Sequence, residues 1–569
     1  MDLNLFQSGL ASGREALLAG DGAAAVAIFE RLAMATVSDA EARYWLASAL
    51  LAIRDTQGAA IAMDDARILH TLALARVMGA DIDRCRADAS YAADIATRLY
   101  QQNHVAMSGV VRALALSSGG IEASGLLSYG LTLQHQGRTE EASEVFRAAV
   151  ETFPSSQLHQ FLLYPLLLSD DGDARYAAEA REWARLYALA LPAEPHPNPC
   201  RDGRKLRVAY LAPSFAGTQV RQFIAPLLEH HNRAQVAVTL YPAIAGTEKD
   251  WPSWIDVHPI GHLSDADVAD LIRRDRIDVL ADCWGHSAGS RLLVFARRPA
   301  PVQVGWINFI QTTGLGQIDY IMHADAPNFL PTDGLFTERI WRIGPVFNAF
   351  RPPDGRLAPT QTPALRTGQI TFGSFNHPVK LSDRTFDAWA AILRQAPSSR
   401  LLLKYRYFDD PVLQRVTQAR LAARGVAPER LIFAGHSHGA DYFRAFGDVD
   451  LMLDAWPAPG STTTLDALSN GVPVLGLGGP TLAGHYTSSI LVASGLPELA
   501  ATDPSDFVER ALDLTADPMR LDALRARVRP NFEKGPVCDG AAYTARVEVA
   551  FGEMFDLWRR NQRPTVGDA

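Results

Sequence analysis

The sequence predicts an α + α/β protein, with a helical first third followed by two doubly wound, Rossmann-like domains. Residues up to about 195 are rich in Ala and Leu, almost free of Pro, and apolar at helical spacing. From Lys205 onward, apolar strand-like segments alternate with amphipathic helical ones, the pattern of parallel sheets covered on both faces. We therefore expect a helical domain over 1–195, α/β domains over 205–355 and 368–540, and a terminal helix with a tail over 541–569.

The helical third contains a repeat of about 34 residues. Its clearest unit has apolar and small residues at the offsets of a tetratricopeptide repeat, namely Leu126, Tyr129, Gly130, Leu133, Ala142, Phe146, Ala149 and Pro154. Gly130 lets the two helices approach closely, Phe146 fills the gap, and Gly137 turns the chain. A looser unit includes Gly13 and Phe29. Stacked repeats form a concave surface that binds extended protein segments, and the alternative is that they only dimerise or support the next domain.

The two α/β series each contain apolar segments typical of buried parallel strands. The first series has them at 206–213, 236–242, 278–285, 302–307 and 319–325, and a Pro-containing connection at 351–368 ends it. The second series has them at 370–376, 399–408, 430–436, 450–456 and 472–478. Ligands of such sheets bind beyond the carboxyl ends of the strands, so two facing domains form a cleft. A last helix, 541–560, would cross back and tie the halves together.

The composition excludes several classes of protein. The 569 residues include 54 Lys and Arg against 63 Asp and Glu, a net charge of −9 without basic blocks, so nucleic acid is not an expected ligand. The start is acidic and helical where a signal peptide would be basic and then apolar, and no run of about 18 apolar residues occurs. The four cysteines, Cys85, Cys200, Cys283 and Cys538, form no CxxC pair. We expect reduced thiols in a soluble, cytoplasmic protein.

A small, hydroxyl-rich stretch, Gly460 to Asp466, lies between an apolar strand and a predicted helix start. Exposed N–H groups of a first helical turn, the helix dipole and the hydroxyls of Ser461, Thr462 and Thr463 would together hold a diphosphate. Ordinary helix capping by Thr463, with an acid three residues later, explains the same residues without any ligand. The place of this stretch at a strand end that faces Lys380 favours the ligand site.

Two further strand ends carry candidate groups. His286 lies in a small-residue loop directly after a strand, which predicts that it points toward the cleft; a capping or packing histidine is the alternative. Lys380 follows a strand of the facing domain, where its ammonium would reach an anion and His377 would donate as well; a surface lysine is the alternative. The two histidines of 434–443 have no third ligand at metal spacing, so no metal ion is expected.

These motifs occur in the order of a known family. Helical repeats, then GHSAGSRLLVFARRPAPVQ (285–303), FGSFNHPVK (372–380) and PGSTTTLDALSNGVPVL (459–475), resemble the O-linked N-acetylglucosamine transferases, in particular their bacterial members. That family joins tetratricopeptide repeats to a glycosyltransferase of the GT-B type. The resemblance implies a UDP-sugar donor, usually UDP-N-acetylglucosamine, and inverting transfer to Ser or Thr hydroxyls of an acceptor protein. It also implies that neither a metal ion nor another cofactor takes part.

The resemblance assigns roles to residues of this sequence. The family's phosphate-binding lysine falls on Lys380, its hydroxyl-rich helix start on Thr462 and Thr463, and its ribose-contacting acid on Asp466. His377 occupies a position that is commonly Gln in animal members, and Ser461 one that is His or Gly. The expected nucleotide-binding set is Phe375, Asn376, His377, Lys380, Gly460, Ser461, Thr462, Thr463 and Asp466, and the expected catalytic set is Lys380, His286 and Thr218.

Three departures from the family pattern bear on activity. Thr218 stands where relatives have a histidine proposed as base or sugar contact, and threonine is no general base near neutral pH. The loop 308–314 has Ile310 and Gln311 in place of a Pro and a Gly, and Tyr442 lies near where relatives have a histidine. Water, the donor phosphate or His286 would then accept the proton. The sequence favours a protein O-glycosyltransferase, weakened by these changes. One alternative is a catalytically inactive scaffold that binds a nucleotide sugar and a partner protein. Another is a nucleotide-sugar epimerase or hydrolase on the same fold, which the repeat domain argues against.

Overall fold

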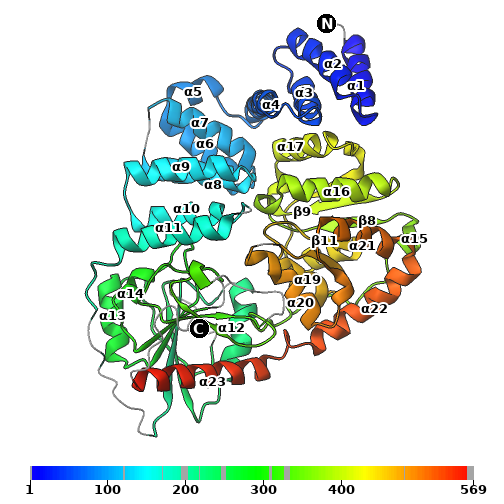
Figure 1. Cartoon of the computed structure of the whole chain (residues 1–569). Helices are drawn as coiled ribbons and strands as arrows, with labels where there is room; N and C mark the ends of the chain where they lie inside the picture. The colour runs from blue at the N-terminus through cyan, green and yellow to red at the C-terminus, as the bar shows by residue number, and fades with distance from the viewer. Residues whose placement is uncertain are drawn as a thin grey trace.

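The structure is a computed structural model and describes residues 3–119, 122–169, 171–193, 196, 203–216, 218–244, 251–306, 310–325, 333–479 and 481–560. A helical part at the start of the chain contacts two α/β lobes that lie beside each other (Figure 1). The predicted connection at 191–204 lies mostly outside the described residues, as do Cys200 and the tail from 561 onward.

In the helical part, each helix packs against the next one along the chain. A Cβ atom added to Gly130 would lie 2.4 Å from the ring of Phe146, and one added to Gly13 would lie 2.6 Å from the ring of Phe29. Both predicted repeat units therefore use the same glycine–phenylalanine contact. The helices are α1 (Leu3–Leu18), α2 (Gly22–Ala35), α3 (Ala40–Ala52), α4 (Thr56–Val77), α5 (Ile82–Ala87), α6 (Ala89–Gln101), α7 (Val105–Ser117), α8 (Ala123–His135), α9 (Thr139–Thr152), α10 (Ser156–Leu166) and α11 (Gly172–Tyr187).

The first lobe is a 7-stranded parallel sheet in the order β3-β2-β1-β4-β5-β6-β7. Two of its strands were not predicted, because β3 has only two residues and β7, Arg-Ile-Trp-Arg, is polar and partly exposed. The elements are β1 (Leu206–Ala212), α12 (Thr218–His230), β2 (Val236–Pro242), β3 (Asp256–Val257), α13 (Asp265–Arg274), β4 (Val279–Asp282), α14 (Leu292–Ala296), β5 (Val302–Gly305), β6 (Tyr320–His323), η2 (Asp333–Leu335) and β7 (Arg339–Arg342).

The second lobe is a 6-stranded parallel sheet in the order β10-β9-β8-β11-β12-β13. Its first five strands lie in the predicted segments, and the two-residue β13 was not predicted. The strands are β8 (Thr371–Ser374), β9 (Arg400–Lys404), β10 (Leu431–Ala434), β11 (Leu451–Leu453), β12 (Val474–Leu477) and β13 (Ala500–Ala501). The helical elements are α15 (Ala364–Thr367), η3 (Pro378–Lys380), α16 (Asp383–Gln395), η4 (Arg406–Asp409), α17 (Pro411–Ala422), η5 (Pro428–Arg430), α18 (Gly439–Arg444), η6 (Ala445–Asp448), α19 (Thr462–Ser469), η7 (Ala483–His485), α20 (Tyr486–Ala493), η8 (Pro497–Leu499), α21 (Pro504–Ala516) and α22 (Pro518–Lys534).

The last helix, α23 (Gly540–Arg559), returns from the second lobe to the first, as the sequence predicts (Figure 1). It packs against α12 and β5. The hydroxyl of its buried Tyr543 donates to Phe347 O at 2.6 Å and accepts from the indole N–H of Trp306 at 3.0 Å. Glu548 accepts from Asn232 N at 2.7 Å. The helix therefore ties the two lobes together.

The helical part is fixed to the second lobe by a buried carboxylate. Helix α17 packs against α3, α4 and α7. Asp410, fully buried, caps its own helix by accepting from the N–H groups of Val412 and Leu413 at 2.9 and 3.2 Å. The same side chain caps α7 by accepting from Ala106 N and Met107 N at 2.7 and 3.1 Å. One side chain thus satisfies first-turn N–H groups of two helices from different parts of the chain.

Among the helices of the described residues, none is long and apolar enough to cross a membrane.

Candidate functional site

A cavity of about 370 Å³ lies where the helical part and the two lobes meet. The helical part contributes Tyr164, Leu167 and Leu168 to its wall. The first lobe contributes Val220, Phe223, Trp284, Ser287, Ile310 and Asn348. The second lobe contributes Lys380, Ala458, Pro459, Gly460, Ser461, Thr462, Ala483 and Tyr486, the residues around the start of α19. Of the predicted set, Lys380, Gly460, Ser461 and Thr462 therefore line one wall together.

The start of α19 presents its backbone to this cavity. The helix begins at Thr462, and the side chain of the preceding Ser461 makes no capping hydrogen bond. Gly460 has no room for a side chain, because an added Cβ atom would lie 2.6 and 2.7 Å from the hydroxyls of Thr464 and Thr463. Glycine is therefore required for the close turn into the helix. A helix start that faces a cavity with open N–H groups and a positive dipole end is suited to an anion.

Asp454, at the end of β11, holds this turn in place and was not predicted as a site residue. Its buried carboxylate accepts from Gly460 N at 2.6 Å, Ala455 N at 2.8 Å and the amide of Asn376 at 3.1 Å. The Asn376 oxygen in turn accepts from the hydroxyl of Thr463 at 3.3 Å. Asn376 and Thr463, both in the predicted set, thus shape the turn and do not line the cavity. The available signal was an acidic residue directly after a buried strand.

Lys380 lies beside the same turn. Its Nζ atom donates to Pro459 O at 2.6 Å, which brings the ammonium to the entry of α19. Burial lowers the pKa of Lys380, and the nearby carboxylate of Asp454 opposes this effect. A lysine and a helix start on one cavity wall form a cationic site for a phosphate or diphosphate group.

Asp466 is buried at 6% exposure one turn into α19. Its Oδ2 atom accepts from the hydroxyl of Tyr442 at 3.1 Å. Burial raises the pKa of Asp466 to about 7, while hydrogen bonds from Tyr442 and Gln222 lower it. Gln222 belongs to α12 of the first lobe, so this carboxyl lies at the contact of the two lobes. The departure at Tyr442 is therefore coupled directly to the predicted ribose-contacting acid.

The prediction that His286 points toward the cleft is wrong, because the loop turns its ring the other way. Asp282 accepts from Trp284 N and Gly285 N at 3.2 and 2.8 Å, which turns the chain directly after β4. The imidazole of His286 then lies 4.8 Å from the ring of Trp183 in α11, 2% exposed, with Nε2 2.8 Å from Thr313 O. Burial lowers its pKa to about 4. His286 is therefore a packing residue, the alternative given above. Its neighbours Trp284 and Ser287 line the cavity instead.

Phe375 and His377 also lie behind the cavity wall. The ring of Phe375 is buried 4.5 Å from that of Phe446. The ring of His377 lies 4.6 Å from that of Tyr405 and 5.2 Å from that of His135, which belongs to α8 of the helical part. His377 accepts from Val379 N at 3.0 Å and so caps the turn that carries Lys380. Both residues support the site from behind.

The loops that depart from the family pattern are described in part. Thr218 is the first residue of α12, but its side chain lies outside the described residues, as do Asn308 and Phe309. Ile310 lines the cavity. Gln311 is buried and its amide donates to Asp173 of α11 at 2.7 Å.

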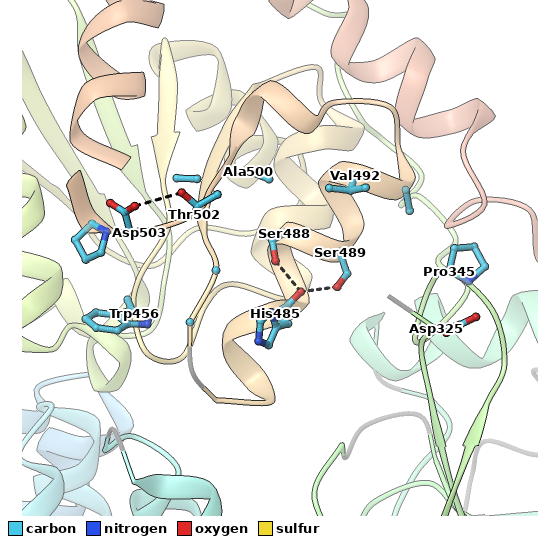
Figure 2. A pocket seen from close by; sticks show the side chains of 15 residues that line it. Asp325, Pro345, Trp456, His485, Ser488, Ser489, Val492, Ala500, Thr502 and Asp503 are labelled. Atoms are coloured by element: carbon cyan, nitrogen blue, oxygen red, sulfur yellow. Dashed lines mark hydrogen bonds between the residues drawn. The ribbon is translucent and has the colours of Figure 1, made fainter. Parts of the chain in front are cut away.

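A larger cavity, of about 480 Å³, lies on the other side of η7 and α20 (Figure 2). In Figure 2, His485, Ser488 and Ser489 stand on the second-lobe side, across from Asp325 and Pro345 of the first lobe. None of the predicted site residues lines it. Of these two cavities, the smaller one is therefore where the described residues of the predicted site lie.

Two doubly wound lobes that face a shared cleft, with a lysine and a helix start on the second lobe, define a GT-B glycosyltransferase architecture. The comparison with protein families gives the same answer. The model of glycosyl transferase family 41 matches residues 147–342 and 356–547, and this chain belongs to that family.

Curated relatives match about 70% of the chain. The probable UDP-N-acetylglucosamine–peptide N-acetylglucosaminyltransferase SPINDLY of Oryza sativa subsp. japonica is 33% identical over 409 residues, 69% of this chain and 43% of the relative. The probable enzyme of the same activity named SEC, from Arabidopsis thaliana, is 26% identical over 74% of this chain and 45% of its own length. The chain thus spans less than half the length of these relatives.

One solved structure matches almost the whole chain. A mutant form of the O-GlcNAc transferase of Thermobaculum terrenum has a TM-score of 0.75 and 28% identity, with 98% of each chain covered. This similarity extends through the helical part and both lobes.

Proposed function

We propose that this chain transfers N-acetylglucosamine from a UDP-sugar to Ser or Thr hydroxyls of proteins, with inversion at the anomeric carbon and without a metal ion. The observation that carries the proposal is the wall formed by Lys380 and the start of α19, which faces a cavity shared by both lobes. Family membership and the names of the relatives support the choice of donor.

In this reaction the second lobe holds the departing nucleotide. The N–H groups of the first turn of α19 and the ammonium of Lys380 would stabilise the negative charge that develops on the diphosphate. The turn is preformed by Asp454, so little reorganisation is needed when the donor binds. Asp466 would accept a hydrogen bond from the ribose, as the family resemblance implies.

The proton of the acceptor hydroxyl needs a group at the cavity. His286 is unsuited to this task because it is buried against α11, and burial holds its pKa at about 4. We therefore assign the proton to a phosphate oxygen of the donor or to water. With this assignment, the reaction does not need the histidine that relatives have at the position of Thr218.

The acceptor would approach from the helical part. Tyr164, Leu167 and Leu168 of this part lie in the cavity wall, so a protein segment bound along the repeats can reach the donor. The proposal places the reaction in the cytoplasm, in keeping with Cys85 and Cys283, which are buried as free thiols.

The test is UDP release by the purified chain, with and without candidate acceptor proteins, followed by mass spectrometry of the acceptor. A panel of UDP-N-acetylglucosamine, UDP-glucose and GDP-linked sugars identifies the donor. Lys380→Met should abolish transfer and weaken UDP binding at least tenfold, whereas Lys534→Met, which removes the same charge from an exposed site, should leave both unchanged. UDP affinity unaffected by Lys380→Met would refute the site assignment.

The scaffold function is separated by the same measurements. A scaffold binds UDP through Lys380 and α19 but releases no UDP from a UDP-sugar with any acceptor. The apolar Ile310 in the cavity wall is the observation that favours it, because this side chain offers neither a hydrogen bond nor a charge to a sugar.

A further inference from the structure

Asp173, in the first turn of α11, is a residue of the helical part that contacts both lobes beside the cavity. One carboxylate oxygen accepts from the amide of Gln311 in the first lobe at 2.7 Å. The other accepts from Leu482 N in the second lobe at 2.8 Å. The three residues are far apart in the sequence, and the family pattern has a glycine in the region of Gln311.

These contacts lie directly beside the cavity. Ile310 and Ala483, the sequence neighbours of Gln311 and Leu482, line the cavity from the two different lobes. Because the Asp173 carboxylate bonds to Gln311 and Leu482 at once, it fixes the distance between the wall segments that these residues belong to. Asp173 therefore joins the two lobes beside the donor site, together with the stacked rings of Phe347 and Tyr486, 5.5 Å apart.

Helix α11 is a rigid support for this side chain, because it is packed tightly against the first lobe. A Cβ atom added to Gly314 would lie 2.3 Å from Ala180 O of α11. The guanidinium of Arg181 donates to Gly334 O at 2.6 Å. The loop of Gln311 is thus fixed on α11, and Asp173 extends the same support to Leu482.

The second-lobe segment held by Asp173 has open space behind it. Directly after Leu482, the residues of η7 and α20 separate the cavity of about 370 Å³ from the one of about 480 Å³. Figure 2 shows His485, Ser488 and Ser489 of this segment at the larger cavity, across from Asp325. On the other face of the segment, α20 packs against β12 and β13 of its own lobe, so Asp173 supplies a contact that this packing does not.

We propose that Asp173 is a positioning residue of the transfer reaction: it latches the Leu482 segment to the Gln311 loop and so holds the two lobes at the separation that the reaction requires. This inference rests on the proposed function for its kinetic consequence, but the latch itself is a structural claim. It also gives Gln311 a role in an active enzyme. From the sequence alone, Gln311 is interpreted as a departure that weakens activity.

The test uses four variants whose hydrogen-bonding capacity differs at this contact. Asp173→Ala removes both acceptors, and Gln311→Glu places a second carboxylate against the first. Asp173→Asn keeps an acceptor for Leu482 N, and its amide can donate to the oxygen of Gln311 once that amide rotates. The double variant Asp173→Asn with Gln311→Glu restores a donor opposite an acceptor. Asp171→Ala, an exposed carboxylate two residues away, is the matched control.

Three readouts separate positioning from general damage. Hydrogen exchange of the Leu482 amide reports the latch, calorimetry reports UDP affinity, and steady-state kinetics report kcat and KM for the acceptor. Asp173→Ala and Gln311→Glu should accelerate exchange and lower kcat, each at least tenfold. The Kd for UDP should change less than threefold, because the groups proposed to hold the diphosphate, Lys380 and the start of α19, both belong to the second lobe. Asp173→Asn, the double variant and Asp171→Ala should stay near wild type.

Unchanged exchange of the Leu482 amide in Asp173→Ala, or a double variant as impaired as Gln311→Glu alone, would overturn the latch. A tenfold loss of UDP affinity in Asp173→Ala would also overturn it, since a positioning role leaves that affinity intact. A wild-type chain without transfer activity would refute the proposed function, whereas the exchange rates would still decide for or against the latch.

Discussion

Replacing Asp466 by Asn should stabilise the protein at neutral pH while weakening nucleotide binding. The carboxyl is 6% exposed, and burial raises its pKa from 3.8 to about 7. A tenfold change in an ionisation constant is worth about 1.4 kcal/mol, so ionising this group in the folded protein costs about 4 kcal/mol more than in the unfolded chain. The asparagine variant carries no such cost and can still accept from the Tyr442 hydroxyl.

The sign of the pH dependence follows from proton binding. Because the folded pKa lies above the unfolded one, the folded protein holds this proton more tightly, and stability falls as the pH rises from about 4 to about 7. The advantage of Asp466→Asn over wild type should therefore grow by roughly 4 kcal/mol between pH 4 and pH 8. Below pH 4 and above pH 7 it should be constant.

The assay is urea unfolding of the nucleotide-free protein, followed by tryptophan fluorescence from pH 4 to pH 8. Asp448→Asn, which changes an exposed carboxylate of the same lobe, is the control and should show no such trend. A stability difference between Asp466→Asn and wild type that stays flat across this range would refute the reasoning. UDP calorimetry on the same samples should show at least a tenfold loss of affinity in the asparagine variant.

The other predictions concern three separate parts of the molecule. Gly130→Ala should lower the free energy of unfolding by about 1–3 kcal/mol, because the new methyl group would overlap the buried ring of Phe146. Gly552→Ala, with open space around it, should instead raise it by about 0.5–1 kcal/mol. Thermal unfolding compares the two variants. Asp410→Ala should lower the free energy of unfolding by at least about 3 kcal/mol, since it leaves buried N–H groups of two helices unpaired. Urea unfolding compares it with the exposed Asp441→Ala, and an effect of Asp410→Ala as small as that of Asp441→Ala would contradict the prediction. The affinity for UDP should fall as the pH rises and Lys380 loses its proton. This loss should begin at a lower pH than for an ordinary lysine, because burial lowers the pKa of Lys380. Calorimetry from pH 7 to pH 10 tests the prediction, and Lys380→Met should remove the pH dependence.

The sequence predicts best those parts of the site that follow a strand. Lys380 and the start of α19 come after β8 and β11, and parallel strands bring their carboxyl ends to one edge of a sheet. The order of the motifs along the chain was therefore enough to place them on one cavity wall. The same reasoning predicts the strands of both sheets, apart from the two-residue β3 and β13 and the polar β7.

The contacts between distant segments could not be predicted. Strand-end position gives the edge on which a side chain lies but not the direction of its ring, and the turn made by Asp282 directs His286 toward α11. Asp173 meets Gln311 and Leu482 only because the helical part contacts both lobes. Periodicity identifies a buried face, whereas the partner of that face depends on the three-dimensional arrangement.

The shared cap at Asp410 has a consequence for synthesis. The N–H group of Ala106 has its acceptor, the carboxylate of Asp410, 304 residues later in the chain. At about 5–20 residues per second, the ribosome needs roughly 15–60 s to reach that acceptor. During this interval the nascent repeats carry a helix start without its cap, which a holding chaperone could reach.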